Sequence, residues 1–289
     1  MDCPICFSSK TSKDGVKYGK QKYHCLHCGR YFTEPSSPKK RIIIVSDTHC
    51  GHLWGLTPPL YWTQYIEDAF KFQKESWTWF TNTISLLKPF DMVIANGDLI
   101  DGRGEKSGGT ELMVVDRMKQ AEMAAEIINT IEASDVLIAR GTEYHVGNAE
   151  QFEDHIAKHT DAIEIADKIR FKVNGALFDV RHHVGRSTVP WSEITASLKE
   201  LVLANLERSE EVNMLIRSHI HKYTYGSIGP NQAAITTPGL EGHSRFGTRR
   251  CSGRVDFGVV VMDVDEKGII NSKPIIASLE SLKPVIKNY

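Results

Sequence analysis

Aspartate and histidine recur where several apolar segments of the chain end, and both residue types bind metal ions. The segments RIIIV, DMVIA, ALFDV and NMLIR are each followed within three residues by such a residue. The residues concerned are Asp47, His49, Asp98, His182, His183, His219 and His221. Carboxylate and imidazole ligands suit Mn²⁺, Fe and Zn²⁺. A metal centre is therefore the first chemistry that the sequence suggests.

A further segment end, RGTEYH, carries Thr142, Glu143 and His145. Taken singly, each motif has an ordinary explanation: Asp-x-His as a cap, Gly-Asp as a turn, and His-x-His as a satisfied pair at a sheet edge. No rule for turns or caps requires ligands at five successive segment ends. The combination therefore favours one shared site.

The elements that must position these residues read as alternating strands and helices. We expect strands at 41–45, 91–98, 135–142, 176–183, 213–219 and 233–237, and a hairpin over 254–270 that turns near Asp265 to Gly268. Helical spacing predicts helices at 62–87, 112–133 and 190–207. This is an α/β layer architecture, in which ligands gather beyond the strand ends.

The order D-x-H, G-D, a third motif beginning at Gly141, H, and H-x-H resembles the calcineurin-like metallophosphoesterase superfamily. The resemblance spans roughly Arg41 to Asp265 and implies an α/β/β/α sandwich of two sheets with a dinuclear metal centre. It implies one metal held by Asp47, His49 and His221. Asp98 would bridge both metals, and His219 with either His182 or His183 would hold the second.

Two positions depart from the superfamily pattern. Ser218 replaces the glycine of G-H-x-H, and Gly141-Thr142-Glu143-Tyr144-His145 stands where the family has Gly-Asn-His. Thr142 could offer a weaker hydroxyl ligand, Glu143 could bind metal instead, and His145 could act as the catalytic imidazole or only pack. Some phage and prophage members of the superfamily are similar here and in SDTHCGH, which favours a variant site.

The implied chemistry is hydrolysis of a phosphate ester. Two metals about 3.5–4 Å apart would clamp the phosphate and lower the pKa of a bridging water, and the hydroxide would attack in line. His145 would protonate the leaving oxygen or stabilise the phosphoryl charge, and Asp98 would serve as the bridging carboxylate. Mn²⁺ is our working choice from the resemblance, with Fe or Zn²⁺ as alternatives.

Other residues near these motifs admit two interpretations each. Cys50 is interpreted as a packing residue, and His52 either contacts substrate or caps a turn. Asp101 and Arg103 either orient a phosphate or a ligand or lie in a solvated turn, and a loop carries three arginines that either bind phosphate or are surface charge: Arg245, Arg249 and Arg250.

The first 33 residues contain two Cys-x-x-C pairs, CPIC and CLHC, whose cysteines are Cys3, Cys6, Cys25 and Cys28. Their spacing predicts a zinc ribbon with one structural Zn, since so short a segment needs metal to fold. Two disulfides are the alternative, and His24 or His27 could replace a cysteine. We expect a hairpin between the pairs, a linker at 34–40, and a metallophosphoesterase domain at 41–289.

The ribbon resembles those at the N-terminus of some transposases, which implies contact with nucleic acid. The candidate residues are Lys17, Lys20, Lys22 and Arg30, with Tyr18 or Tyr23. Residues 1–41 carry nine Lys/Arg against three Asp/Glu, whereas the remainder carries 26 against 33. A basic arm on an acidic body favours a polyanionic partner, although a solvated charged hairpin would look the same.

Nothing in the sequence resembles a membrane span or a secretory signal, which predicts a cytoplasmic protein, in the host cell if phage-encoded. Three functions fit these observations. The first is a metal-dependent phosphodiesterase, possibly a nuclease on DNA. The second is a phosphomonoesterase or small-nucleotide phosphodiesterase with a structural ribbon. The third is a non-catalytic nucleic-acid-binding protein with a degenerate phosphoesterase body.

Overall fold

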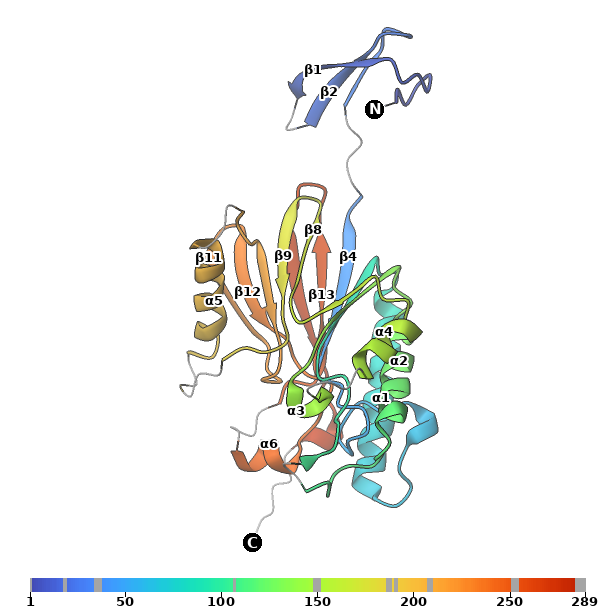
Figure 1. Cartoon of the computed structure of the whole chain (residues 1–289), viewed down its shortest axis with the longest axis vertical. Helices are drawn as coiled ribbons and strands as arrows, with labels where there is room; N and C mark the ends of the chain where they lie inside the picture. Colours follow the sequence, from blue (N-terminus) through green and yellow to red (C-terminus); the bar gives the residue numbers. More distant parts are fainter. Residues whose placement is uncertain are drawn as a thin grey trace. The chain divides into compact units, whose positions relative to one another are not determined.

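The computed structural model describes residues 2–17, 20–33, 38–105, 108–147, 152–185, 189, 192–206, 210–250 and 255–283, without the side chains of Lys20, Phe246, Arg249 and Arg250. The chain divides into two units, Met1–Pro38 and Lys39–Tyr289 (Figure 1). The expected linker, 34–40, ends one residue earlier than predicted. Lys40 is the first residue of a strand because its backbone pairs with Val264. Residues 34–37 of that linker lie outside the described residues.

The N-terminal unit is a small antiparallel sheet in the order β1-β2-β3. Its strands are β1 (Thr11–Lys17), β2 (Lys20–Cys25) and β3 (Tyr31–Thr33). The expected hairpin corresponds to β1 and β2, which pair from Thr11 with Cys25 to Lys17 with Lys20. The turn residues 18 and 19, and with them the candidate Tyr18, lie outside the described residues.

The larger unit contains two sheets. The six-stranded sheet has the order β14-β13-β4-β5-β6-β7. Its strands are β4 (Lys40–Val45), β5 (Met92–Asn96), β6 (Asp135–Ala139), β7 (Glu164–Ala166), β13 (Gly258–Val264) and β14 (Ile270–Ile276). Strands β4 to β7 run parallel, so their carboxyl ends meet at one edge of the sheet.

The five-stranded sheet has the order β11-β12-β10-β9-β8. Its strands are β8 (Ile169–Val173), β9 (Ala176–Val180), β10 (Met214–Arg217), β11 (Thr224–Gly229) and β12 (Gln232–Thr236). The central strands β9, β10 and β12 run parallel, and the outer two are antiparallel to their neighbours.

The four longer helices lie on the outer faces of the two sheets, whereas the two short helices, at 143–146 and 245–250, lie beyond the ends of the strands (Figure 1). The helices of the described residues are α1 (Glu67–Leu87), α2 (Arg117–Ile131), α3 (Glu143–Val146), α4 (Phe152–His159), α5 (Thr195–Leu206) and α6 (Arg245–Arg250), with the 3-10 turns η1 (Pro59–Tyr61) and η4 (Glu280–Leu282). The three long expected helices correspond to α1, α2 and α5. Strands β7, β8 and β11 and helices α3, α4 and α6 were not predicted.

Both ends of α2 differ from the prediction of 112–133 for physical reasons. The carboxylate of Asp116 accepts hydrogen bonds from the backbone of Met118 and Lys119, so the helix begins only after this cap. At the other end, Glu132 has a left-handed backbone that ends the helix after Ile131.

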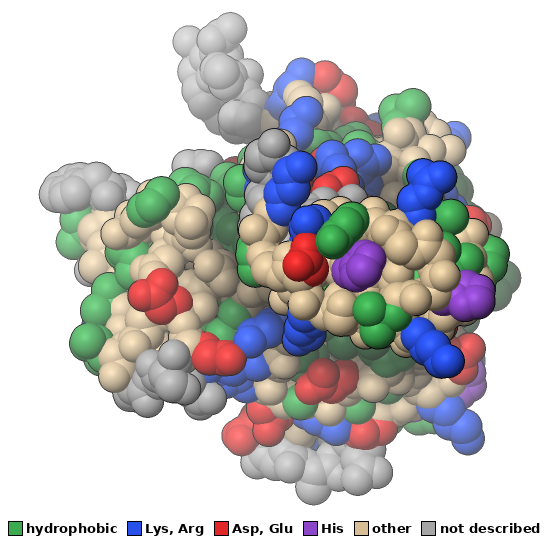
Figure 2. All heavy atoms as spheres, turned by 90° about the horizontal axis from the view of Figure 1, so that it is seen from above, with side chains coloured by type: hydrophobic (Ala, Val, Ile, Leu, Met, Phe, Trp, Pro, Cys, Tyr) green, Lys and Arg blue, Asp and Glu red, His purple; other side chains and the backbone are tan. Residues whose placement is uncertain are grey.

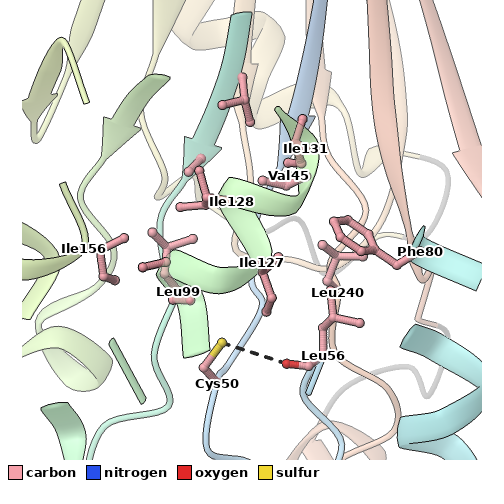
Figure 3. Close-up of a cluster of buried hydrophobic side chains, with 14 of the residues drawn as sticks. Val45, Cys50, Leu56, Phe80, Leu99, Ile127, Ile128, Ile131, Ile156 and Leu240 are labelled. Atoms are coloured by element: carbon pink, nitrogen blue, oxygen red, sulfur yellow. Dashed lines mark hydrogen bonds between the residues drawn. The ribbon is translucent and has the colours of Figure 1, made fainter. Parts of the chain in front are cut away.

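Three apolar cores define four layers. One core joins the helical layer of α1, α2 and α4 to the six-stranded sheet; Figure 3 shows part of it, with Ile127, Ile128 and Ile131 of α2 beside Val45 of β4. Alternate residues of the same strands, such as Ile42 and Ile44, face the second sheet. A third core packs α5 on the five-stranded sheet. This is the predicted α/β/β/α architecture of two sheets.

Candidate metal centre

The carboxyl ends of β4, β5, β9 and β10 bring the predicted ligands together. Among the described residues, two groups of Asp and His have ligand atoms within 4.8 Å of one another around Asp47. One group is Asp47, His49 and His221, and the other is Asp47, Asp98, His182 and His219. Residues separated by more than 170 positions thus meet at one point.

In the first group, Nε2 of His221 lies 3.2 Å from Oδ1 of Asp47 and 3.4 Å from Nε2 of His49. Asp47 and His49 are buried at the end of β4. Three ligand atoms therefore point toward one small volume.

In the second group, Oδ2 of Asp98 lies 2.9 Å from Nε2 of His182 and 3.6 Å from Nδ1 of His219. Nε2 of His182 also lies 3.8 Å from Oδ1 of Asp47. Asp47 is the carboxylate that both groups share in this geometry. The bridging position that the sequence indicated for Asp98 stays a prediction.

The ring of His182, rather than that of His183, faces the other ligands. Nδ1 of His182 lies 2.6 Å from the carbonyl oxygen of Asn96, to which it donates, so Nε2 is left for a metal. His183 is exposed and belongs to neither group. Its ring centroid lies 4.9 Å from that of His219, beside the site.

The backbone at the candidate ligands is strained. Nine non-glycine residues in the described part of the chain have a positive φ, and five of them are Asp47, His49, Asp98, His219 and His221. Such left-handed backbone is costly and tends to persist where function requires it. The strand ends are therefore bent to aim their side chains inward.

Thr142 donates to the candidate ligand Asp98. Its backbone N–H and its hydroxyl lie 2.6 Å and 3.0 Å from Oδ1 of that carboxylate. Thr142 therefore fixes the orientation of Asp98. Glu143, the other predicted substitute for the asparagine, is exposed and is in none of the ligand groups of the described residues.

Glu153, on α4, is a residue that the sequence analysis missed. The N–H of Gly141 donates to Oε1 of Glu153 at 3.0 Å, which holds the loop that carries Thr142 and His145. A side chain at Gly141 would meet the backbone nitrogen of Asp98 at 2.4 Å, so the approach requires glycine. Burial raises the pKa of Glu153 to about 8. No motif marks this residue in the sequence.

His145 stands beside both groups. Its Nδ1 lies 2.9 Å from the backbone oxygen of Asp101, and its Nε2 lies 4.0 Å from Oδ2 of Asp98. Burial lowers the pKa of His145. With His49 and Asp101 it forms a further set of side chains with metal-ligand spacing.

The electrostatics of the centre favour a cation. Burial raises the pKa of the Asp47 and Asp98 carboxyls, but nearby imidazoles outweigh burial and lower both pKa values overall. Conversely, burial lowers the pKa of His182, but Asp98 and Asp47 raise it to about 9. The carboxylates thus stabilise positive charge between them, which a divalent ion would supply in place of protons.

The unpaired atoms fit the same conclusion. Oδ1 of Asp47, Nε2 of His182 and Nδ1 of His49 are buried without a hydrogen-bond partner. Nε2 of His182 is near Asp98, yet the two atoms lack hydrogen-bond geometry. Buried polar atoms are costly unless they are satisfied. The donor set of carboxylates and imidazoles therefore fits divalent transition metals.

Further buried carboxylates surround the centre. Asp101 lies 3.4 Å from Nδ1 of His49, and Glu241 lies 3.2 Å from Nδ1 of His52. On the other side of the His52 ring, Glu111 lies 3.8 Å from Nε2. Glu241 and Glu111 were not predicted, because each follows an irregular stretch without a recognisable motif.

Cys50 packs in the core, as expected, with its thiol 3.9 Å from the carbonyl oxygen of Leu56 (Figure 3). Burial raises its pKa to about 12, which keeps it protonated. Arg103 and Arg245 are exposed, and Arg245 donates its backbone N–H to Glu111. The side chains of Arg249 and Arg250 lie outside the described residues.

The four cysteines of the N-terminal unit form a group with metal-ligand spacing. The Sγ atoms of Cys3 and Cys28 lie 3.7 Å apart, and those of Cys6 and Cys25 lie 3.6 Å apart. A disulfide requires about 2.05 Å, so these cysteines are free thiols. The backbone N–H of Cys28 lowers the pKa of Cys25 to about 6. The alternative of two disulfides is therefore not realised.

Lys17 and Arg30 are exposed on the N-terminal unit. Lys22 is partly neutralised, since its Nζ lies 2.8 Å from Asp14 and 4.1 Å from the ring of Tyr31. Tyr23 is buried and stacks on Phe32. Figure 2 shows Lys and Arg side chains distributed among side chains of other types on the face it presents. The strand residue Lys20 has no described side chain.

No helix in the described part of the chain is both long and apolar enough to cross a bilayer.

Comparison with known proteins gives no family. No family model matches this chain, and no curated protein matches it.

Solved structures resemble it weakly. An archaeal phosphodiesterase is 13% identical, with 81% of this chain and 99% of the other covered and a TM-score of 0.43. Zinc-bound Vps29 of Entamoeba histolytica is 12% identical, with 82% and 98% covered and a TM-score of 0.41. The phosphoesterase Yfce of E. coli is 11% identical, with 84% and 100% covered and a TM-score of 0.40. Similarity at this level assigns no activity to the chain.

Proposed function

We propose that this chain is a phosphodiesterase that depends on two divalent cations. The observation that carries the proposal is the pair of ligand groups around Asp47, in which two buried ligand atoms, Oδ1 of Asp47 and Nε2 of His182, lack a hydrogen-bond partner. One ion would be held by Asp47, His49 and His221. The other would be held by Asp98, His182 and His219, with Asp47 or Asp98 shared. Mn²⁺ is our working choice, and Fe or Zn²⁺ suits the same ligands.

Bound cations would supply Lewis acidity, which stabilises the charge on a phosphoryl group and makes water a stronger nucleophile. The buried carboxylates Asp47, Asp98, Asp101 and Glu241 would repel a phosphate in the absence of that charge. We therefore expect hydrolysis to depend fully on added metal.

His145 is the proposed proton carrier. Its Nδ1 is held by the carbonyl of Asp101, so Nε2 is the atom that would take up and release a proton. Its pKa is lowered by burial, and a weakly held proton passes readily to an oxyanion that leaves from phosphorus.

A diester in nucleic acid is the proposed substrate class. The ribbon itself, residues 1–33, carries six Lys/Arg against two Asp, because the other three basic residues of 1–41 belong to the second unit and pair with its aspartates. Phosphate contacts by Lys and Arg dominate non-specific affinity for nucleic acid. The ribbon would thus concentrate the substrate near the body of the same chain.

One observation keeps a non-catalytic body as the alternative: Thr142 replaces the asparagine of the superfamily pattern. Its two hydrogen bonds to Asp98 support a working site instead, because they orient a candidate ligand.

The test is hydrolysis of bis-p-nitrophenyl phosphate and of the monoester by metal-stripped protein with added Mn²⁺. Asp98→Asn is the blank, because it keeps the side-chain shape but loses the charge. We expect turnover of the diester that the variant lacks, followed by cleavage of labelled DNA. Faster turnover of the monoester would favour the phosphomonoesterase, and no turnover under Mn²⁺, Zn²⁺ and Fe²⁺ alike would favour the binding protein.

A further inference from the structure

Glu241 is a buried carboxylate that faces three imidazoles. Its oxygens lie 3.4 Å from Nδ1 of His221, 3.7 Å from Nε2 of His49 and 3.2 Å from Nδ1 of His52. The side chain of Glu241 is only 9% exposed. A carboxylate so removed from water requires partners, and Nδ1 of His221 is the ring nitrogen placed to donate to it, because Nδ1 of His52 accepts the backbone N–H of Trp54.

The backbone fixes where this carboxylate lies. The N–H of Leu240, the preceding residue, donates to the carbonyl oxygens of Ser46 and Asp47. Glu241 itself forms an isolated β-bridge with Gly55. The loop that carries Glu241 is thereby attached to the segment that carries Asp47 and His49.

The candidate ligands share one arrangement of their ring nitrogens. Nε2 of His221 points at Asp47, while its Nδ1 points at Glu241. His49 has Nε2 toward His221 and Nδ1 toward Asp101. A carboxylate on the outer nitrogen of a ligand imidazole fixes its tautomer and increases its basicity, which strengthens metal binding.

We propose that Glu241 is a positioning residue for one of the two ions, the one bound by Asp47, His49 and His221. Its ion pairs among the described residues are with His49, His52 and His221, and none is with His182 or His219. Removal of its charge therefore lowers the affinity for the first ion and leaves the affinity for the second ion unchanged. The inference rests on the two-ion centre of the proposed function.

Glu111 provides a matched control. It is another buried glutamate that faces His52, at 3.8 Å, and it contacts neither His49 nor His221 among the described residues. Glu111→Gln and Glu241→Gln each remove one buried negative charge next to the same imidazole. Only the second variant removes a charge next to candidate ligands.

The experiment is calorimetric titration of Mn²⁺ into the full-length protein, for wild type and both variants. The Asp and His groups are first stripped of metal, and the four-cysteine group keeps its zinc. We expect two ions on wild type and on Glu111→Gln. In Glu241→Gln, one ion should bind about 10- to 100-fold more weakly, with the other unchanged. Long-range ¹H–¹⁵N spectra of the protein loaded with diamagnetic Zn²⁺ should show a proton on Nδ1 of His221 in wild type, and this proton should exchange faster with water in Glu241→Gln.

The outcomes separate the two proposals. Fewer than two ions on wild type would overturn the proposed function itself. Two ions on wild type with unchanged affinities in Glu241→Gln would overturn only the role of Glu241. An equal loss of affinity for both ions in Glu241→Gln would show a general structural effect, and so would the same loss of affinity in Glu111→Gln. Either result would also overturn the role of Glu241.

Discussion

At the scale of single residues, the orientation of Asp98 is the feature on which the second proposed ion would depend. The backbone N–H and the hydroxyl of Thr142 both donate to Oδ1 of this carboxylate, and the hydroxyl also lies 3.2 Å from Oδ2, the oxygen that faces His182 and His219. Thr142 thus has a role that its place in the motif did not reveal. The sequence suggested it as a weak ligand, and the geometry makes it a hydrogen-bond donor.

Substitution of Thr142 tests that role. Thr142→Val keeps the side-chain shape and the hydrogen bond from the backbone N–H, but it loses the hydrogen bond from the hydroxyl. A hydrogen bond to a charged oxygen contributes about 1.5–3 kcal/mol. We expect turnover of the diester to fall about 10- to 100-fold, as the conversion of that energy implies. Thr142→Ser, which retains the hydroxyl, should stay near wild type. Equal turnover in the two variants would contradict the assignment.

At the scale of the elements, the sequence predicted the strands that are continuous apolar runs and missed β7, β8 and β11, which are largely half-buried or exposed. RIIIV and DMVIAN became β4 and β5, and the ligands follow them as expected. It could not predict the left-handed backbone of Asp47 or His49, because those angles arise from contacts with distant loops. Glu153 and Glu241 were missed for the same reason, since only tertiary packing brings them to the site.

Gly97, which follows β5, tests how closely the elements pack at the site. Its φ is +75°, and an added Cβ would lie 2.5 Å from Cγ of His182. Gly175 is a matched control, with a φ of +89° and no atom within 4 Å. Both alanine variants should lose about 1–2 kcal/mol of stability to the backbone angle. Only Gly97→Ala should also lose Mn²⁺ affinity, measured by calorimetry; retained affinity would show that His182 is not a ligand.

The second sheet contains a buried ion pair that makes stability depend on pH. Asp179 of β9 lies 2.8 Å from Nη2 of Arg217 on β10, and both side chains are buried. Burial raises the pKa of Asp179, but Arg217 and Lys168 outweigh it and lower the pKa overall. Because the folded pKa is below the unfolded value of about 3.9, the stabilisation is present above pH 4. It is lost as the pH falls through the folded pKa.

We expect the free energy of unfolding of wild type to fall below pH 4. Asp179→Asn should lose about 3 kcal/mol at pH 7, since it removes one of the two carboxylates that pair with the buried Arg217 and leaves only Glu200, and it should show a shallower fall in acid. Urea unfolding followed by tryptophan fluorescence measures this, because all five Trp residues lie beyond residue 41. Asp161→Asn, at an exposed position, serves as the control. Parallel pH profiles for wild type and Asp179→Asn would refute the account.

At the scale of the whole molecule, we expect the two units to have separate functions. Residues 1–38 hold the cysteine group, and residues 39–289 hold the Asp and His groups. No ligand group in the described residues combines side chains from both units. Loss of the first unit's metal should therefore leave the chemistry of the second unchanged.

The double variant Cys6→Ser/Cys25→Ser tests this division. Without the zinc ligands the small unit cannot fold, because it buries too little apolar surface. We expect one zinc fewer per chain by mass spectrometry and loss of salt-dependent DNA binding. Turnover of bis-p-nitrophenyl phosphate should stay within about twofold of wild type, as expected for independent sites that share no residue. Unchanged DNA binding would remove the proposed role of the ribbon.

The central claim is that this chain holds two catalytic ions around Asp47. Anomalous diffraction at the manganese edge, from crystals soaked in Mn²⁺, locates such ions directly. We predict two peaks: one among Asp47, His49 and His221, and one among Asp98, His182 and His219. A single peak, or peaks away from these residues, would contradict the two-ion account.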